Sequence, residues 1–415
     1  MPNLYDTFGT DGFDDLYKQF EADESIPRTT IGGQELILDL LKERAETGRI
    51  YLMNIDHCNS HSSFLDKVEM SNLCQEITLP TKPIQHIDDK FGEIALCILS
   101  AINVGKIRDA SDFEVLCDLS VRSLDELIDF QGYPVNAAEI ATRARRSLGV
   151  GYIGLAHYLA KQGVKYDDPE AWKLVHDLTE SFQYYLIKAS VNLAKEKGAC
   201  EYSDRTKYAQ GILPIDTYKK DVDEIVPNDL LLDWESLRAE VLEHGIRNST
   251  LSAQMPSESS SVVSNATNGI EPPRDYLSVK KSKKGPLKQI VPSYGTLKNN
   301  YTLLWDMPSN TGYINVVAVM QKFFDQAISG NWSYNPQHYE NNEVPVSVMA
   351  QDLLTTYKYG WKTSYYQNTY DAKTDEVEIS LPTSDDVGIQ GHTQLQSLVD
   401  ELINSEEESC ESCAI

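Results

Sequence analysis

The residues best suited to chemistry lie in one short run, Ser71-Asn72-Leu73-Cys74-Gln75-Glu76-Ile77. In an extended chain alternate side chains point to the same side, so Asn72, Cys74 and Glu76 would share one face, with Cys74 and Glu76 about 6 to 7 Å apart. A thiol flanked by an amide and a carboxylate can form a radical or a nucleophile that has its own base. The polar face of an edge strand would show the same pattern, and the run by itself favours that simpler interpretation.

A second candidate is the C-terminal pair Cys410-Glu-Ser-Cys413. The CxxC spacing lowers the pKa of one thiol and lets the pair cycle between dithiol and disulfide. A metal site would need a second cysteine pair, which the sequence lacks. The pair ends a segment, residues 371–415, with twelve Asp or Glu residues and one Lys, which predicts a solvated, flexible tail. As a random coil, residues 371–409 would span about 35 Å, which suits a redox shuttle.

The other cysteines have simpler interpretations. Cys97 lies in the apolar run GEIALCILS and is predicted to be a buried core thiol. Cys117 and Cys200 are expected to be structural. Cys58 has two histidines nearby, but no second cysteine pair stands at zinc-ligand spacing, so a metal site is not expected.

A polar turn follows Met255, formed by Pro256, Ser257, Glu258, Ser259 and Ser260. Hydroxyl and backbone N–H groups at the start of a helix suit phosphate oxygens. An ordinary polar loop with a helix cap explains these residues equally well.

Three further patterns are ambiguous or misleading. Tyr184-Tyr185 lies in a predicted helix, where core packing with one ring partly exposed is the simplest role. Tyr365-Tyr366 lies just before the tail, and the sequence alone does not rank the two pairs. Gly149-Val-Gly151-Tyr-Ile-Gly154 matches GxGxxG but follows the basic helix end ATRARRSL instead of an apolar strand. We therefore reject a dinucleotide site and predict that these glycines permit close packing.

The elements that must position these residues alternate between strands and helices, which indicates an α/β fold. Helix 169–197 is the clearest prediction, because Asp168 can cap it, Pro169 suits its first turn and Gly198 can end it. The same patterns predict helices within 1–49 and over 112–130, 135–147, 313–329 and 346–362. They predict extended segments at 50–55, 74–80 and 92–107, and a polar loop region at 247–274. The pattern does not separate a barrel from an open sheet.

The composition excludes several classes of function. The formal net charge of −26 opposes the positive field that a nucleic-acid groove needs, so DNA and RNA are not expected partners. No apolar run reaches the roughly 18 residues of a membrane span. The acidic N-terminus lacks the apolar region of a signal peptide, and we expect a cytoplasmic protein.

Several long runs resemble the large (alpha) subunit of class Ia ribonucleoside-diphosphate reductases. They are RIYLMNIDHCNSHSSF, SNLCQEITLPTKP, EIALCILSAINVG, ILPIDTYKK, GIRNSTLSAQMPSESSSVVSNATNGIEPPR, WDMPSNTGY, TSYYQNTYD and the C-terminal dithiol. The resemblance extends from near residue 10 to the end, in the family's order. It implies that residues 1–370 are the C-terminal portion of a ten-stranded α/β barrel and that residues 371–415 are a flexible redox tail.

The resemblance also implies roles for the candidate residues. Cys74 would carry the thiyl radical that removes the 3′ hydrogen of the ribose, Glu76 would act as base on the 3′ hydroxyl, and Asn72 would be its hydrogen-bonding partner. Cys97 would be half of the redox pair that delivers two electrons at C2′, which overrules its core interpretation. Pro256–Ser260 would hold the substrate diphosphate. Tyr365 and Tyr366 would end the radical path, and Cys410 and Cys413 would re-reduce the active-site disulfide.

The family implies partners as well. A metal-containing small subunit would generate the radical, thioredoxin or glutaredoxin would supply electrons, and a ribonucleoside diphosphate would be the substrate; no cofactor or metal is expected on this chain itself. The family's large subunit is much longer, and its N-terminal half carries effector regions, part of the barrel and the second redox cysteine. We therefore expect either a truncated chain or, as the lack of a tag or linker scar favours, a split gene with a complementary N-terminal chain. The alternative is a non-catalytic regulatory fragment that docks on the small subunit or on a thioredoxin-like protein.

Overall fold

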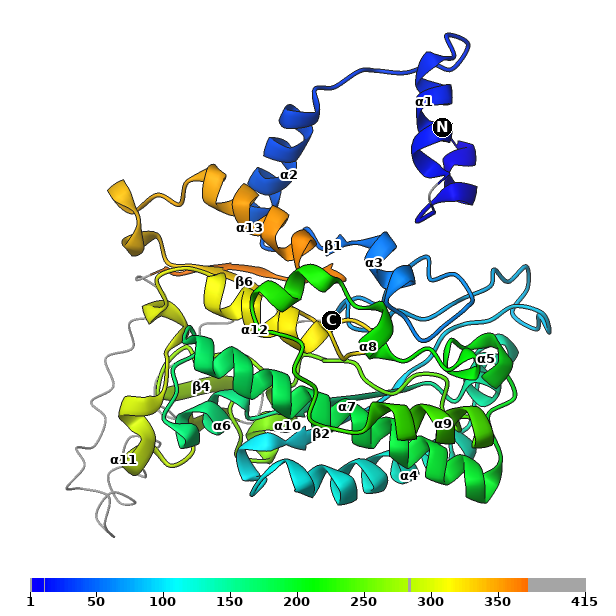
Figure 1. The fold of residues 1–415 in the computed structure, drawn as a ribbon. Coiled ribbons are helices and arrows are strands. Elements are labelled where there is room, and N and C mark those ends of the chain that lie inside the picture. Colours follow the sequence, from blue (N-terminus) through cyan, green and yellow to red (C-terminus); the bar gives the residue numbers. More distant parts are fainter. Residues whose placement is uncertain (1, 11, 283–284, 372–415) are drawn as a thin grey trace.

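The computed structural model describes residues 2–10, 12–282 and 285–371 (Figure 1). Within these ranges the chain is a mixed α/β structure, as its alternating pattern predicts. β2 (Ile98–Asn103) and β3 (Leu148–Ile153) pair in parallel, as do β6 (Trp332–Tyr334) and β8 (Gln367–Thr369). β1 (Leu52–Met53) and β7 (Thr363–Ser364) pair antiparallel, as do β4 (Leu277–Ser282) and β5 (Gly285–Ile290).

Two extended segments join the parallel pairs into one series. Val150 of β3 forms a parallel bridge with Ser252, and Gln254 forms one with Ile328. The N–H of Ser329 donates to the carbonyl of Gln254 at 3.0 Å. Residues 250–254 and 326–329 therefore lie side by side next to β3, and the second segment continues into β6.

Helices pack against this series. α4 (Phe113–Phe130) contacts β2 and β3, and α7 (Pro169–Lys197) contacts α4, α9 (Trp234–His244) and α12 (Thr311–Gln321); Figure 1 shows α4 and α7 side by side. The ring of Phe182 on α7 lies 5.3 Å from Tyr152 and 5.6 Å from Phe324. The remaining α-helices are α1 (Phe13–Ala22), α2 (Gly33–Thr47), α3 (Ile55–Ser60), α5 (Asn136–Arg145), α6 (Leu155–Gln162), α8 (Pro214–Thr217), α10 (Glu258–Val263), α11 (Tyr294–Leu297) and α13 (Val346–Lys358).

Helix α7 has the predicted bounds, and its ends show why. Pro169 occupies the first turn, and Gly198 takes a φ of +85° just after the last residue, a conformation that glycine adopts without steric cost. The predicted cap by Asp168 is wrong, because its carboxylate accepts the N–H of Lys165 at 3.0 Å instead.

The glycines of the GxGxxG run serve close packing, as predicted. A β-carbon on Gly149 would lie 2.8 Å from Sγ of Cys97, and one on Gly151 would lie 2.7 Å from the carbonyl oxygen of Ala253. Both glycines belong to β3, a fully buried strand that the basic residues before it concealed in the sequence.

The polar region 247–274 is only partly a loop. Asn248, Ser249, Thr250, Ser252 and Gln254 are all buried beside β3. The side chains of Asn248, Ser249, Ser252 and Gln254 have protein partners; the amide of Gln254, for example, donates to the carbonyl of Tyr152 at 3.0 Å. The hydroxyl of Thr250 is buried without a hydrogen-bond partner among the described residues. Burial of a polar group costs little when the group is hydrogen-bonded, so this segment joins the series despite its composition.

The ends of the last two helices also differ from prediction. α12 ends at Gln321 and α13 at Lys358, short of the expected residues 329 and 362. The buried ammonium group of Lys362 donates to the carbonyls of Phe324, Asp325 and Gln326, at 3.2, 2.7 and 3.0 Å. These bonds stabilise a turn there, after which residues 326–329 join the series.

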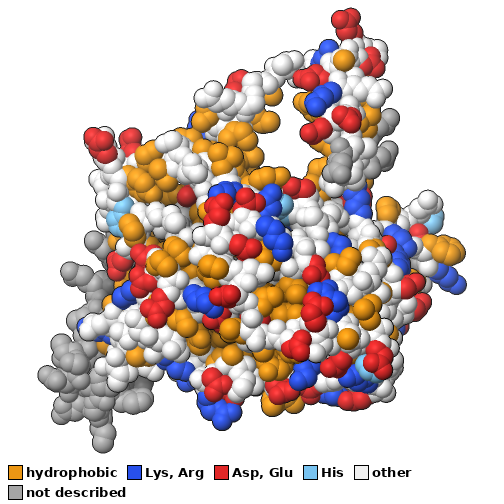
Figure 2. Space-filling view, viewed as in Figure 1, with side chains coloured by type: hydrophobic (Ala, Val, Ile, Leu, Met, Phe, Trp, Pro, Cys, Tyr) orange, Lys and Arg blue, Asp and Glu red, His pale blue; other side chains and the backbone are white. Residues whose placement is uncertain are grey.

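The parallel series does not close into a barrel within the described residues, and the second edge of β2 has no strand partner among them. Apolar side chains stay exposed on α4, at Val115, Leu119, Leu127 and Phe130. Figure 2 shows a further apolar patch over α2 and α13, where Leu36 and Leu354 are exposed. Unpaired edges and exposed apolar patches are typical of surfaces that another chain or segment covers. No helix in the described part of the chain is long and apolar enough to cross a membrane.

Candidate active site

Cys74 lies at the tip of a turn, not in the predicted strand. The N–H of Asn72 donates to the carbonyl of Ile77 at 3.2 Å, and the side-chain oxygen of Asn72 accepts the N–H of Ile77 at 3.0 Å. Gln75 adopts a φ of +71°. The prediction of strict alternation across residues 72–76 is therefore wrong, because the Asn72 side chain satisfies the backbone locally and closes the turn.

Beyond the turn the chain runs antiparallel to residues 326–329. The hydroxyl of Ser329 donates to the carbonyl of Cys74 at 2.5 Å, and the N–H of Ala327 donates to the carbonyl of Glu76 at 3.0 Å. The N–H of Thr78 donates to the side-chain oxygen of Gln326 at 3.3 Å. One short segment of the parallel series thus holds the whole stem of the Cys74 turn.

The same segment brings Glu76 and Cys97 to this site. Glu76 is 3% exposed, and its carboxylate oxygen lies 3.2 Å from the hydroxyl oxygen of Ser329. Cys97 is half-buried and packs against a small apolar cluster, so the predicted buried core thiol is confirmed only in part; its sulfur also accepts the amide N–H of Gln326 at 3.5 Å. Burial raises the pKa of Cys97 to about 12; the hydrogen bond from Gln326 opposes this shift, and the negative charge of Glu76 adds to it.

Two tyrosines connect Cys74 to the surface. The hydroxyl of Tyr365 donates to the sulfur of Cys74 at 3.4 Å. The ring centroid of Tyr366 lies 4.2 Å from that of Tyr365, and the two residues are 36% and 6% exposed. The rings therefore form a continuous path from solvent to the thiol.

The comparison with known proteins agrees with this geometry. A family model described as "Ribonucleotide reductase, barrel domain" matches residues 1–367. The chain belongs to the ribonucleotide reductase family. The resemblance found in its sequence is thereby confirmed.

The chain is 57% identical over 383 residues to the ribonucleoside-diphosphate reductase subunit alpha of Haemophilus influenzae, a match that covers 91% of this chain and 51% of the relative. It is 52% identical over 395 residues to the ribonucleoside-diphosphate reductase 1 subunit alpha of Escherichia coli, covering 94% and 52%. The subunit alpha of Enterobacteria phage T4 is 44% identical over 384 residues, covering 91% and 50%. The chain thus spans about half the length of the curated relatives it matches.

Four residues around the Cys74 thiol were not among the candidates that the sequence predicts. Gln326 and Ser329 lie in residues 313–329, where the sequence pattern predicts a helix. Tyr51 contacts both tyrosines, and the buried guanidinium of Arg44 donates to the carbonyls of Tyr365 and Tyr366 at 2.9 and 3.3 Å. The run RIYLMNI was a visible signal for Tyr51, but nothing local distinguishes Arg44 from any other helical arginine.

The serine-rich turn, Pro256–Ser260, follows the segment 250–254 of the parallel series, close to this site. It follows Gln254, whose carbonyl accepts the N–H of Ser329. Ser257 is buried, and its hydroxyl donates to the carbonyl of Met255 at 3.0 Å, whereas Pro256, Glu258, Ser259 and Ser260 are exposed at the start of α10. The turn is therefore placed next to Ser329 by its backbone.

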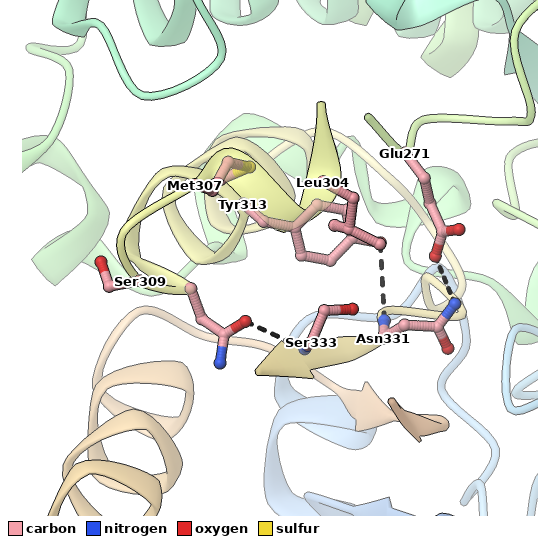
Figure 3. A pocket seen from close by; sticks show the side chains of 8 residues that line it. Glu271, Leu304, Met307, Ser309, Tyr313, Asn331 and Ser333 are labelled. Carbon is pink, nitrogen blue, oxygen red and sulfur yellow. Dashed lines mark hydrogen bonds between the residues drawn. The ribbon is translucent and has the colours of Figure 1, made fainter. Parts of the chain in front are cut away.

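Glu271, Tyr313 and Asn331 help to line a separate small pocket (Figure 3), and Asn331 also contacts Tyr366. Asn331 connects the two places, because its side-chain oxygen accepts the N–H of Tyr366 at 3.1 Å while its amide group donates to Glu271. Burial raises the pKa of Glu271, and the hydrogen bond from Asn331 opposes that shift. The other lining residues are Leu304, Met307, Ser309, Asn310 and Ser333.

Residues with ligand-type side chains elsewhere have structural partners. Cys58 is buried, with its sulfur 3.7 Å from the carbonyl of Lys362, and the ring of His57 contacts the carbonyl of Trp361 at 2.8 Å. Among the described residues, His176, Asp177 and Glu180 have the spacing of a metal site. The Glu180 carboxylate, however, already accepts the N–H groups of Leu231, Leu232 and Trp234.

The remaining cysteines divide into two sets. Cys117 and Cys200 are buried, as predicted. Cys410 and Cys413 lie outside the residues that the structure describes, so the redox tail remains a prediction.

Proposed function

We propose that this chain is part of the catalytic subunit of a ribonucleoside-diphosphate reductase, which reduces ribonucleotides to 2′-deoxyribonucleotides for DNA synthesis by thiyl-radical chemistry. The observation that carries the proposal is the contact between the Tyr365 hydroxyl and the Cys74 sulfur at 3.4 Å. A phenol at this distance can exchange a hydrogen atom with a thiol. No packing requirement explains a tyrosine pair that ends on a cysteine.

The first step uses this contact. An oxyl radical on Tyr365 takes the hydrogen atom of the Cys74 thiol, so an O–H bond forms, the S–H bond breaks, and the unpaired electron passes to sulfur. Tyr366 would deliver the radical from the metal-containing small subunit, because it is the more exposed of the pair.

The second step acts on the substrate. The Cys74 radical removes the 3′ hydrogen of the ribose, and Glu76 accepts the proton of the 3′ hydroxyl. The side-chain oxygen of Asn72 already accepts the N–H of Ile77 in the turn. Its proposed hydrogen bond to Glu76 would therefore be donated by its amide N–H₂ group. The 2′ hydroxyl takes up a proton and leaves as water. Cys97 and a second cysteine from the rest of the large subunit supply two electrons and two protons, of which one hydrogen ends on C2′ and the other in the water, and the two sulfurs form a disulfide. Cys74 then returns its hydrogen atom to C3′ and is again a radical.

The other roles complete the cycle. The turn Pro256–Ser260 holds the diphosphate; the exposure of its serines at the start of α10 and the backbone contact of Gln254 with Ser329 support this role. Cys410 and Cys413 reduce the disulfide and are themselves reduced by thioredoxin or glutaredoxin. Because the chain spans about half of its relatives, we propose that it is active only with a complementary N-terminal chain and the small subunit.

Reconstitution tests the proposal. The full chain is combined with a complementary N-terminal chain and a small subunit, and dithiol-dependent formation of deoxynucleotides is measured. Cys74→Ser should abolish product, whereas Cys200→Ala, a buried thiol away from the site, should retain it. If Cys74→Ser retained activity, or if the intact mixture produced no deoxynucleotide, the catalytic proposal would fail in favour of a regulatory fragment that only docks on its partners.

A further inference from the structure

Tyr51 makes the tyrosine pair a cluster of three rings. It precedes β1, far from the pair in sequence. Its ring centroid lies 4.7 Å from that of Tyr365, with the rings tilted by 46°, and 5.4 Å from that of Tyr366, in an edge-to-face arrangement at 87°. Tyr51 therefore touches both members of the pair at once.

A single side chain, that of Arg44, forms hydrogen bonds to the backbone next to all three rings. Arg44 of α2 is fully buried and lies over the ring of Trp332 at 4.6 Å. Its guanidinium donates to the carbonyl of Ile50, which precedes Tyr51, and to those of Tyr365 and Tyr366. Burial lowers the pKa of Arg44 only to about 10, so the group stays charged at neutral pH. A charged donor to three carbonyls fixes the backbone at all three tyrosines.

The hydroxyl groups of the cluster interact with one another. The neighbouring hydroxyl groups of Tyr365 and Tyr51 lower the pKa of Tyr366, the positive charge of Arg49 acts in the same direction, and burial and Cys74 oppose them. Burial and the hydrogen bond to Tyr366 raise the pKa of Tyr51 to about 12, against smaller opposing effects from Tyr365 and Arg49. The edge-to-face contact of the two rings at 5.4 Å and these two shifts both fit a Tyr51 hydroxyl that faces the oxygen of Tyr366.

We propose that Tyr51 is a positioning residue for radical transfer, whose hydroxyl donates to the oxygen of Tyr366 and holds it in line with Tyr365. The transfer step moves one electron and one proton: the Tyr365 O–H bond breaks, the Tyr366 O–H bond forms, and the radical passes to Tyr365. Tyr51 keeps its own proton throughout. This inference rests on the proposed function of the tyrosine pair and adds a residue from a different part of the chain.

A reporter at position 366 tests the contact without any turnover. The full chain is prepared with 3-fluorotyrosine at position 366, and its phenol is titrated by ¹⁹F NMR. Tyr51→Phe removes only the donor hydroxyl, so the pKa of the reporter should rise by about 0.5 to 1, the size expected for one lost hydrogen bond. Tyr17→Phe, on the exposed face of α1, is the matched control and should leave the reporter unchanged. An unchanged reporter in Tyr51→Phe overturns the inference.

Turnover of the reconstituted reductase then tests the role. Tyr51→Phe should slow deoxynucleotide formation by about 3- to 10-fold, as one hydrogen bond is worth roughly 1 kcal/mol. If Tyr365→Phe abolishes turnover and Tyr51→Phe does not change it, the positioning role is wrong and the proposed function stands. If Tyr365→Phe leaves turnover intact, the proposed radical path is wrong and so is the role of Tyr51 in it, whatever the reporter shows.

Discussion

Two regions of the chain each hold an adjacent tyrosine pair, and the two pairs have different neighbours. On α7, the rings of Tyr184 and Tyr185 meet edge to face at 5.4 Å, and Tyr184 contacts Trp234 at 5.5 Å. The cysteine that contacts α7, Cys117, is buried against the carbonyl of Phe182. Beyond β7, by contrast, Tyr365 donates directly to Cys74.

The two tyrosine pairs differ in the groups that they contact. The α7 pair ends on an apolar aromatic core, where rings contribute packing. The second pair ends on a thiol at the tip of a turn, between Glu76 and residues 326–329. Identical residue types therefore acquire chemistry only when the fold gives them a reactive neighbour.

The largest expected effect separates the two pairs directly. Tyr365→Phe removes the hydroxyl that contacts Cys74 and should lower deoxynucleotide formation by the reconstituted reductase on the order of a thousandfold, equivalent to about 4 kcal/mol of barrier. Tyr185→Phe, its counterpart on α7, should leave the rate within about twofold. Similar losses in both variants would contradict the distinction between the pairs.

The second prediction concerns Cys97. The Cys97 thiol stays protonated up to a higher pH than an ordinary cysteine thiol, because burial raises its pKa to about 12. Its reaction with iodoacetamide at pH 8 should be about a thousandfold slower in the folded chain than in urea, since only the thiolate reacts. The rate should keep rising as the pH approaches 12. The protonated thiol also favours the folded state below pH 9, and this contribution should be lost as the pH rises from about 9 to 12. A reaction rate that levels off near pH 9 would contradict this prediction.

The third prediction tests the hydrogen bonds of Arg44 to the backbone of Tyr365 and Tyr366. Arg44→Met leaves three carbonyls without their buried donor and should lower the free energy of unfolding by about 2 to 4 kcal/mol, measured by urea denaturation. Arg122→Met is the control, because Arg122 of α4 forms only partly exposed ion pairs with Asp118 and Glu196. It should cost less than about 1 kcal/mol. An equal cost for both arginines would mean that burial at Arg44 is not decisive.

The smallest effect is expected at Tyr184. Its hydroxyl has no hydrogen-bond partner within the described part of the chain, and its ring contacts persist in phenylalanine. Tyr184→Phe should therefore change the free energy of unfolding by less than about 0.5 kcal/mol. A larger loss in urea denaturation would show that this pair has a polar role as well.

The sequence predicted most of the scaffold from local rules. The bounds of α4, α5 and α7 follow from apolar spacing and from Pro169 and Gly198. It also selected Cys74, Glu76, Cys97 and the second tyrosine pair as candidates, through their resemblance to one family. It failed where polar residues are buried, at 248–254, because local composition does not show which distant groups will satisfy them.

By itself, then, the sequence determined the helices, the α/β class and the family, because these depend on periodicity and on residue types in order. Only the tertiary structure decided that Cys74 lies at a turn, that Tyr365 and not Tyr185 reaches a thiol, and that Arg44 and Tyr51 belong to the site. Arg44 and Tyr365 are separated by 321 positions in the chain. Contacts of that kind follow from the pairing of distant segments, and no local pattern contains them.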